Sequence, residues 1–124
     1  MNATHTVLIV DDDPDVHVLL RGILQRRRFT DLRLEGAADG QAGLERLRQG
    51  GVDLVLSDVN MPRLTGPELI AALAAEGIMV PVILVGSLMR PEDAHGAMGT
   101  LDKQILLTDP ASLRPWLDRL PSRA

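Results

Sequence analysis

The stretch Val52–Pro62, VDLVLSDVNMP, contains a short apolar run that ends on an aspartate and leads into a turn at a proline. The run Leu54-Val55-Leu56 shows no polar alternation, which is typical of a strand buried on both faces of a parallel sheet. A carboxylate that ends such a strand is costly to bury unless it has a partner or a chemical task. Asp58 is therefore the first candidate functional residue of the chain.

Similar apolar runs of strand length lie on both sides of this stretch. They are rich in Val, Ile and Leu, and they cover Thr6–Val10, Asp53–Ser57 and Met79–Val85, with a weaker run at Leu32–Glu35. Between the runs, apolar residues recur at helical spacing over Val16–Leu24, Ala38–Leu47 and Leu69–Ala74. Alternating strands and helices predict an α/β fold, a parallel sheet with helices on both faces.

Helix-start and helix-stop signals support these assignments. Asp13-Pro14 is a cap followed by a first-turn proline, and Gly50-Gly51 closes the second helix. The third helix opens at Thr65–Glu68, which fits either a capping box or a Pro67 first turn. We expect a single domain over residues 1–124, with residues 1–5 and 121–124 as flexible ends.

Composition narrows the class of protein. The chain has 124 residues, a net charge of −4 and a pI of about 5.2, which argue against a general nucleic-acid surface or a membrane anchor. It has no cysteine and no apolar stretch of membrane-spanning length. The start of the chain lacks the features of a signal peptide, so we expect a cytoplasmic protein. The Arg26-Arg27-Arg28 cluster is interpreted as cations at a helix C-terminus.

Acidic residues follow two of the predicted strands. Asp11, Asp12 and Asp13 come directly after the first strand, and Asp58 ends the third. In parallel sheets the carboxyl ends of neighbouring strands meet at one edge, so these carboxylates are expected to converge. Crowded carboxylates repel one another, and a hard divalent cation such as Mg²⁺ relieves that repulsion. Asp13 has an alternative task as the cap of the first helix.

Four segments resemble the receiver domain of two-component response regulators, of the stand-alone chemotaxis type. Val10–Pro14 resembles the acidic-pair motif of that family, and Asp58–Gly66, with Met-Pro at the third and fourth following positions, resembles its phosphoacceptor motif. Pro81–Val85 resembles its fourth strand, and Gly96–Lys103 resembles the Gly-Ala segment before its essential lysine. The resemblance implies a flavodoxin-like, five-stranded parallel sheet of order 2-1-3-4-5, with about five helices.

The resemblance also implies a function. Asp58 would accept a phosphoryl group from a histidine kinase or a histidine phosphotransfer protein, and the change would alter binding of a downstream protein partner. Asp11, Asp12, Asp58 and the backbone carbonyl of Asn60 would hold Mg²⁺ or Mn²⁺, and Lys103 would contact the phosphoryl group. The chain would not itself be an enzyme, and neither nucleic acid nor a membrane would be a direct partner.

The last third departs from the family pattern. Gly86 stands where the family has a Ser or Thr hydroxyl, so Ser87 is the candidate substitute. Thr100 stands where an aromatic residue often reports phosphorylation. The segment between Gly86 and Lys103 is short, with a short helix expected over roughly 91–98. In the last helix, a start near Ser112 would place Pro115 in the first turn.

These departures leave alternatives open. The first is a degenerate receiver that binds its partner regardless of phosphorylation. The second is a small Mg²⁺-dependent phosphohydrolase, which usually needs a second aspartate near its nucleophile, where this chain has Asn60. In the family the last third forms the surface for partner binding, and a homodimer through it is one expectation. His5, His17 and His95 show no metal-ligand spacing and are interpreted as surface residues, His17 within the first helix.

Overall fold

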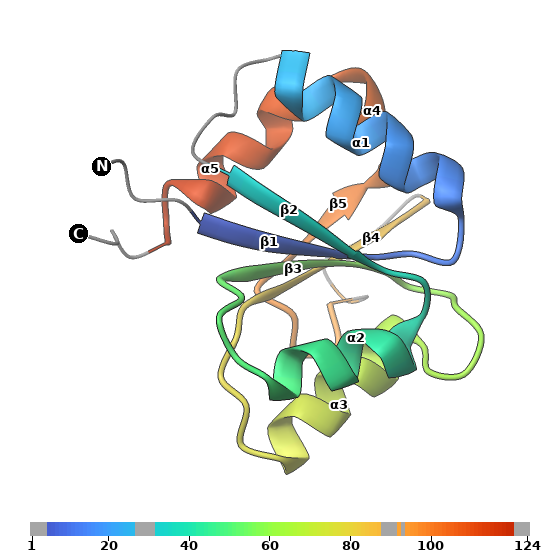
Figure 1. Ribbon diagram of the computed structural model, residues 1–124, viewed down its shortest axis with the longest axis vertical. Helices are drawn as coiled ribbons and strands as arrows, with labels where there is room; N and C mark the ends of the chain where they lie inside the picture. Colours follow the sequence, from blue (N-terminus) through green and yellow to red (C-terminus); the bar gives the residue numbers. More distant parts are fainter. Residues whose placement is uncertain (1–4, 27–31, 88–91, 93, 121–124) are drawn as a thin grey trace.

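The computed structural model describes residues 5–26, 32–87, 92 and 94–120, and its centre is a five-stranded parallel sheet (Figure 1). The strands are β1 (His5–Val10), β2 (Leu32–Ala37), β3 (Leu54–Asp58), β4 (Val82–Gly86) and β5 (Gly99–Asp102). They are arranged in the order β2-β1-β3-β4-β5, and every neighbouring pair is parallel. The predicted fold class and strand order are confirmed.

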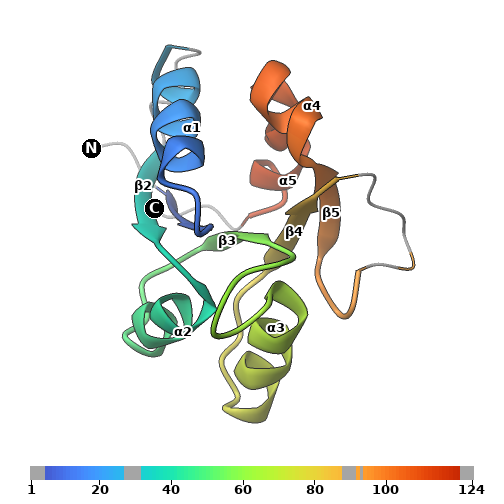
Figure 2. The same cartoon turned by 90° about the vertical axis from the view of Figure 1, so that its right-hand side faces the viewer.

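Helices cover both faces of this sheet. They are α1 (Pro14–Arg26), α2 (Gly40–Arg48), α3 (Gly66–Ala75), α4 (Lys103–Thr108), the 3-10 helix η2 (Pro110–Leu113) and α5 (Arg114–Leu117). Figures 1 and 2 show α1, α4 and α5 on one face and α2 and α3 on the other. Among the described helices, none combines the length and the apolar character needed to cross a bilayer.

Alternate residues of the central strands face the two helical layers. Val7 and Ile9 of β1 belong to the core on the side of α1, α4 and α5, whereas Leu8 and Val10 belong to the core beside α2 and α3. All four are at most 2% exposed. Because both faces of β1 and β3 are buried, the runs Val7–Val10 and Leu54–Leu56 are apolar without alternation, as the opening stretch indicates.

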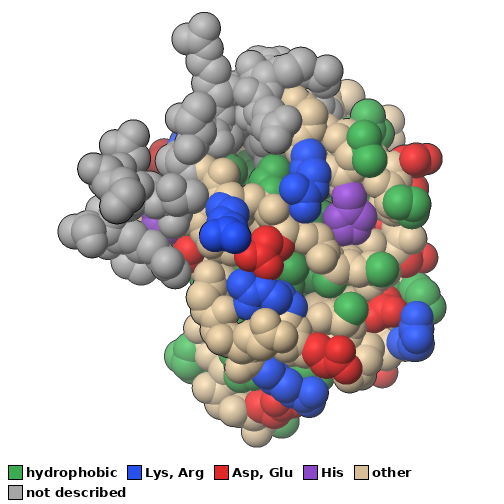
Figure 3. All heavy atoms as spheres, viewed as in Figure 1, with side chains coloured by type: hydrophobic (Ala, Val, Ile, Leu, Met, Phe, Trp, Pro, Cys, Tyr) green, Lys and Arg blue, Asp and Glu red, His purple; other side chains and the backbone are tan. Residues whose placement is uncertain are grey.

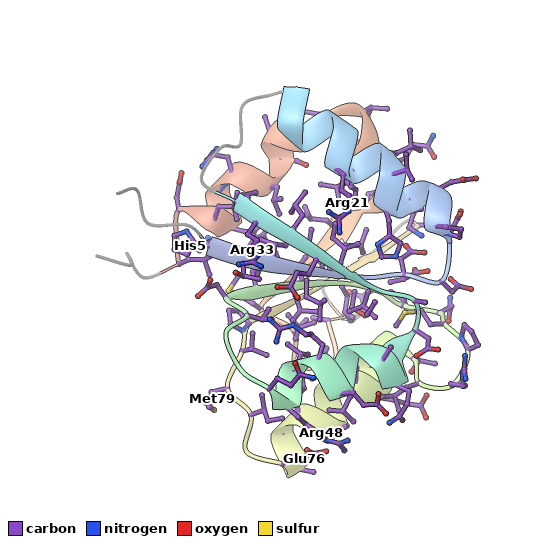
Figure 4. The ribbon with its side chains drawn as sticks, in the orientation of Figure 1. His5, Arg21, Arg33, Arg48, Glu76 and Met79 are labelled. Atoms are coloured by element: carbon purple, nitrogen blue, oxygen red, sulfur yellow. The ribbon has the colours of Figure 1, made fainter. Side chains whose placement is uncertain are left out.

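The helix starts follow the sequence signals. The Asp13 carboxylate accepts a hydrogen bond of 2.9 Å from the Asp15 N–H at the start of α1, which confirms its capping role. At α3, both expected signals are present, since Thr65 and Glu68 form a reciprocal capping box and Pro67 lies in the first turn. Arg48 and Glu76 pair at 2.8 Å and link the ends of α2 and α3 (Figure 4).

Several expectations need correction. Over 94–98 the chain forms turns instead of the expected short helix, while Pro91 and Asp93 lie outside the described residues. The run from Met79 becomes a strand only at Val82. On α1, Leu19 is 48% exposed and does not join the buried stripe.

Other expectations at the ends of elements have different outcomes. Helix α5 begins at Arg114 with Pro115 in its first turn, as expected. His5 is already part of β1, while residues 1–4 and 121–124 lie outside the described residues. Arg26 is the last residue of α1, and the other two arginines of its cluster also lie outside the described part of the chain.

Candidate functional site

The candidate site lies at the carboxyl edge of the sheet, where the ends of four strands bring residues together. Asp11 follows the last residue of β1, and Asp58 is the last residue of β3. Gly86 ends β4, and Lys103 directly follows β5. Parallel strands end at a common edge, so residues far apart in the sequence meet here without any long loop.

Three carboxylates converge at this edge. Asp11, Asp12 and Asp58 each offer an oxygen atom, and these atoms all lie within 4.8 Å of one another. Asp11 is only 3% exposed, whereas Asp12 is exposed. The donor set consists of oxygen alone, with one buried and two more accessible carboxylates, and this chemistry fits Mg²⁺ or Mn²⁺.

Lys103 provides the positive charge that faces these carboxylates. Its Nζ lies 3.0 Å from Oδ2 of Asp11 and 3.4 Å from Oδ2 of Asp58. Burial works to lower the Lys103 pKa, but the hydrogen bond and charge of Asp11, followed by those of Asp58, raise it overall. The lysine is therefore held firmly in its charged form.

Burial raises the pKa of Asp58, and the negative charge of Asp11 acts in the same direction. The charge of Lys103 and the Val59 N–H lower that pKa, but they do not offset the loss of water. The ionised form of Asp58 is thus held at a cost, and a bound cation would reduce that cost.

Backbone groups orient the carboxylates. Asp11 Oδ1 accepts a hydrogen bond of 2.9 Å from the Asp13 N–H, and Asp58 Oδ1 accepts one of 2.9 Å from the Val59 N–H. The backbone carbonyl of Asp11 lies 2.8 Å from Nε2 of His17, which reaches back from α1. The prediction for His17 covered only its place in the helix and missed this contact.

The loop after Asp58 is tied to the start of two helices. The Gly66 N–H donates to the Val59 carbonyl at 2.9 Å, and a Cβ at Gly66 would lie 2.5 Å from the Asp58 carbonyl oxygen, so only glycine fits this approach. Arg63 pairs at 3.0 Å with Asp39, the N-cap of α2. These ties hold the loop, including Asn60, beside the carboxylates.

A hollow of about 420 Å³ opens over Asp58. It is lined by Asp58, Val59, Asn60, Gly86, Ser87, His95 and Lys103. The structure therefore brings together Asp58, Asn60, Ser87 and Lys103 from the predicted set, while Asp11 and Asp12 lie beside them in the carboxylate group. Thr100 pairs with Leu84 inside the sheet and is not one of the lining residues.

The sequence prediction missed His95 as a site residue. It lies in the turn before β5, is exposed, and lines the hollow beside Gly86 and Lys103. Its neighbours in the sequence show no periodic pattern that would place it there. The one available signal was the missing side chain at Gly86, which leaves space opposite Asp58.

Comparisons with known proteins agree with this geometry. The response regulator GtcR of Aneurinibacillus migulanus is 38% identical over 94 residues, which cover 76% of this chain and 37% of that protein. The transcriptional activator protein PfeR of Pseudomonas aeruginosa is 35% identical over 126 residues, covering 93% of this chain and 40% of that protein. The chain thus spans two fifths or less of the length of these curated relatives.

Solved structures give the same result. The chemotaxis protein CheY4 of Vibrio cholerae superimposes with a TM-score of 0.77 at 30% identity, covering 96% of this chain and all of that one. The sequence profile described as the response regulator receiver domain matches residues 7–110. Since that match covers most of the chain, the protein belongs to the response regulator receiver domain family.

Proposed function

We propose that the chain is a phospho-accepting receiver of a two-component phosphorelay, in which Asp58 takes a phosphoryl group from a phosphohistidine. Receiver domains act in two-component signalling, where they interact with histidine kinases or phosphotransfer proteins and with downstream partners. The observation that carries the proposal is the position of Lys103, which lines an open hollow together with Asp58 and pairs both with Asp58 and with the neighbouring Asp11. That arrangement offers both a nucleophile and a counter-charge for a phosphoryl group.

We assign the cation site to Asp11, Asp12, Asp58 and the backbone carbonyl of Asn60. Receiver domains bind Mg²⁺ at an acidic pocket, and the three carboxylate oxygens within 4.8 Å of one another fit that ion or Mn²⁺. When bound, the ion supplies positive charge that offsets the charge of the phosphoryl oxygens and of the carboxylates.

The residues of the chain itself position the transfer. A carboxylate oxygen of Asp58 forms the new bond to phosphorus while the bond from phosphorus to the imidazole nitrogen of the donor breaks. The electron pair of the broken bond stays on the imidazole. The Val59 N–H holds the Asp58 carboxylate in one orientation, and Lys103 stands beside its other oxygen to contact a phosphoryl oxygen.

We further propose that signalling proceeds through partner binding, with no enzymatic activity of the chain's own. Asn60 stands where a phosphohydrolase would carry its second aspartate, which supports this assignment. We also propose that a downstream protein or a second copy binds through the last third, where the family has its partner-binding surface.

Direct nucleic-acid binding is not part of the proposal. The net charge is −4, and positive and negative side chains are interspersed on the face shown in Figure 3. The cytoplasmic location stays a prediction.

Phosphorylation itself tests the proposal. The protein is incubated with Mg²⁺ and acetyl phosphate, and the intact mass is read. We expect a gain of one phosphoryl group, lost in Asp58→Asn and without Mg²⁺ but retained in Asp118→Asn, a matched change at an exposed aspartate of the far helix. No gain in a folded protein that also fails to bind Mg²⁺ would contradict it and favour the phosphorylation-independent module.

A further inference from the structure

Strand β4 itself brings no hydroxyl group to the hollow over Asp58. Gly86 is the last residue of β4 and lines the hollow with backbone alone. A phosphoryl group on Asp58 would contact the Lys103 ammonium. Any further hydrogen-bond donor near the end of β4 would have to come from residues that follow the strand. Among the described lining residues, Ser87 and His95 carry a donor group and come from the segment between β4 and β5.

We propose that His95 is the phosphoryl-sensing residue of this chain, donating a ring N–H to an oxygen of the phosphoryl group carried by Asp58. The inference rests on the proposed function, and it assigns the residue through which that modification is detected. The step is a hydrogen bond only, and no covalent bond changes.

The turn that carries His95 is anchored from both sides. Its backbone is closed by the Ala97 N–H, which donates to the Ala94 carbonyl at 2.7 Å, and the Met98 N–H donates to the Val82 carbonyl of β4 at 2.8 Å. His95 has a φ of 47° and Gly96 a φ of 87°, so the chain reverses sharply here. His95 has no hydrogen-bond partner among the described residues, so its ring is available to a ligand.

His95 is favoured over Ser87 because of reach. Ser87 directly follows Gly86 in a turn and also lines the hollow. Its hydroxyl lies only two bonds from the backbone. The imidazole of His95 carries its ring nitrogens further from the backbone, and it lines the hollow from the turn before β5.

The same turn also borders a second hollow. Gly96 and Met98 line an apolar groove of about 480 Å³, together with residues of α3 and of the loop before β4, among them Ile70 and Met79. In Figure 2 the described part of this segment runs beside α3. A displacement of His95 would therefore be transmitted to the lining of that groove, because Gly96 is one peptide unit away and Met98 is three.

Binding of beryllium fluoride, a stable mimic of the phosphoryl group, tests the proposal in the full chain. Affinity is measured with saturating Mg²⁺ by fluorine NMR for the wild type, His95→Gly and Ser87→Ala. Glycine is chosen because it accepts the left-handed backbone of this position while it removes the ring. Mg²⁺ affinity without beryllium fluoride is measured in each variant as the control for an intact site.

We expect His95→Gly to weaken beryllium fluoride binding by about tenfold, the effect of losing one hydrogen bond to a charged group, with Mg²⁺ affinity unchanged. Ser87→Ala should bind like the wild type. In the wild type, the amide signals of Gly96 and Met98 should shift on binding, and in His95→Gly they should stay in place.

Wild-type affinity in His95→Gly, or a tenfold loss in Ser87→Ala alone, would overturn this inference and leave the proposed function standing. A folded wild type that neither binds beryllium fluoride nor gains a phosphoryl group would overturn the proposed function, and this inference with it.

Discussion

At the scale of single residues, the site depends on one positively charged side chain, which forms ion pairs with two carboxylates. Lys103 is the only lysine of the chain, and its Nζ lies within 3.4 Å of both Asp11 and Asp58. A surface ion pair would contribute little, but Asp11 is almost fully buried, so the loss of its partner would leave a charge without compensation. The lysine thus serves the stability of the site as well as its chemistry.

A single lysine makes its ionisation directly measurable. Reductive methylation with ¹³C-formaldehyde labels Lys103 and the α-amino group, and carbon NMR then follows each through a pH titration. We expect the Lys103 pKa to lie above that of a methylated free lysine, and Asp11→Asn to bring it down. Because the pKa is raised by folding, the stabilisation by Lys103 is present below its ordinary value of 10.5 and lost as pH rises through the folded value. A Lys103 pKa equal to that of free lysine would contradict the ion pairs.

The residues of the site differ in how well the sequence predicts them. Asp11, Asp12 and Asp58 could be placed together because each follows a buried apolar strand, and parallel strands end at one edge. Lys103 could be placed through the family resemblance. His95 and the contact of His17 with Asp11 could not, since both depend on how a turn and a helix pack onto the sheet.

At the scale of elements, β5, which precedes Lys103, meets α5 at a close contact. Gly99 opens β5, and a Cβ there would overlap the outer ring of the Trp116 indole. Trp116 is the only tryptophan of the chain, and it packs against the core on the side of α1, α4 and α5. A side chain at Gly99 would have to push α5 away or displace β5.

We expect Gly99→Ala to lower the free energy of unfolding by about 1–3 kcal/mol, the usual cost of overpacking. Urea unfolding followed by circular dichroism measures the change. In a Trp116→Phe background the same substitution should cost clearly less, because the outer ring is gone. Equal costs in the two backgrounds would show that the contact does not limit the approach of the two elements.

Local signals predict the elements where burial and capping agree. The strands β1 and β3 are apolar on both faces, and α3 carries a capping box and a first-turn proline, so each signal supports the same assignment. The segment 94–98 has Gly96 and weak periodicity, and its path depends on one hydrogen bond within the segment and one to β4, which the sequence does not show. Helix α4 is capped by Asp102, but it is too short for an apolar period to reveal it.

At the scale of the whole molecule, the sheet and its two helical layers hold together a site that opposes folding. The core on each face of the sheet is continuous and apolar. The carboxyl edge, in contrast, gathers three carboxylates against one lysine, and burial raises the pKa of Asp58. Part of the stability supplied by the core therefore offsets the cost of the acidic site. A cation that binds only the folded state raises the free energy of unfolding and compensates that cost.

Asp58→Asn tests whether the ionised Asp58 carboxylate lowers the stability of the folded state. Since the folded-state pKa of Asp58 is raised, its favourable contribution is present below the ordinary value of 3.8 and lost as pH rises through the folded value. Without Mg²⁺ at pH 7, Asp58→Asn should therefore melt at a higher temperature than the wild type, and the difference should vanish near pH 3.

With Mg²⁺ at a hundred times its dissociation constant, the wild type should gain about 2.7 kcal/mol of stability. The variant, which lacks one metal ligand, should gain less stability from Mg²⁺. The difference between the two melting temperatures should therefore become smaller or change sign. A variant that is less stable than the wild type in metal-free buffer would show that Lys103 already compensates the Asp58 charge in full.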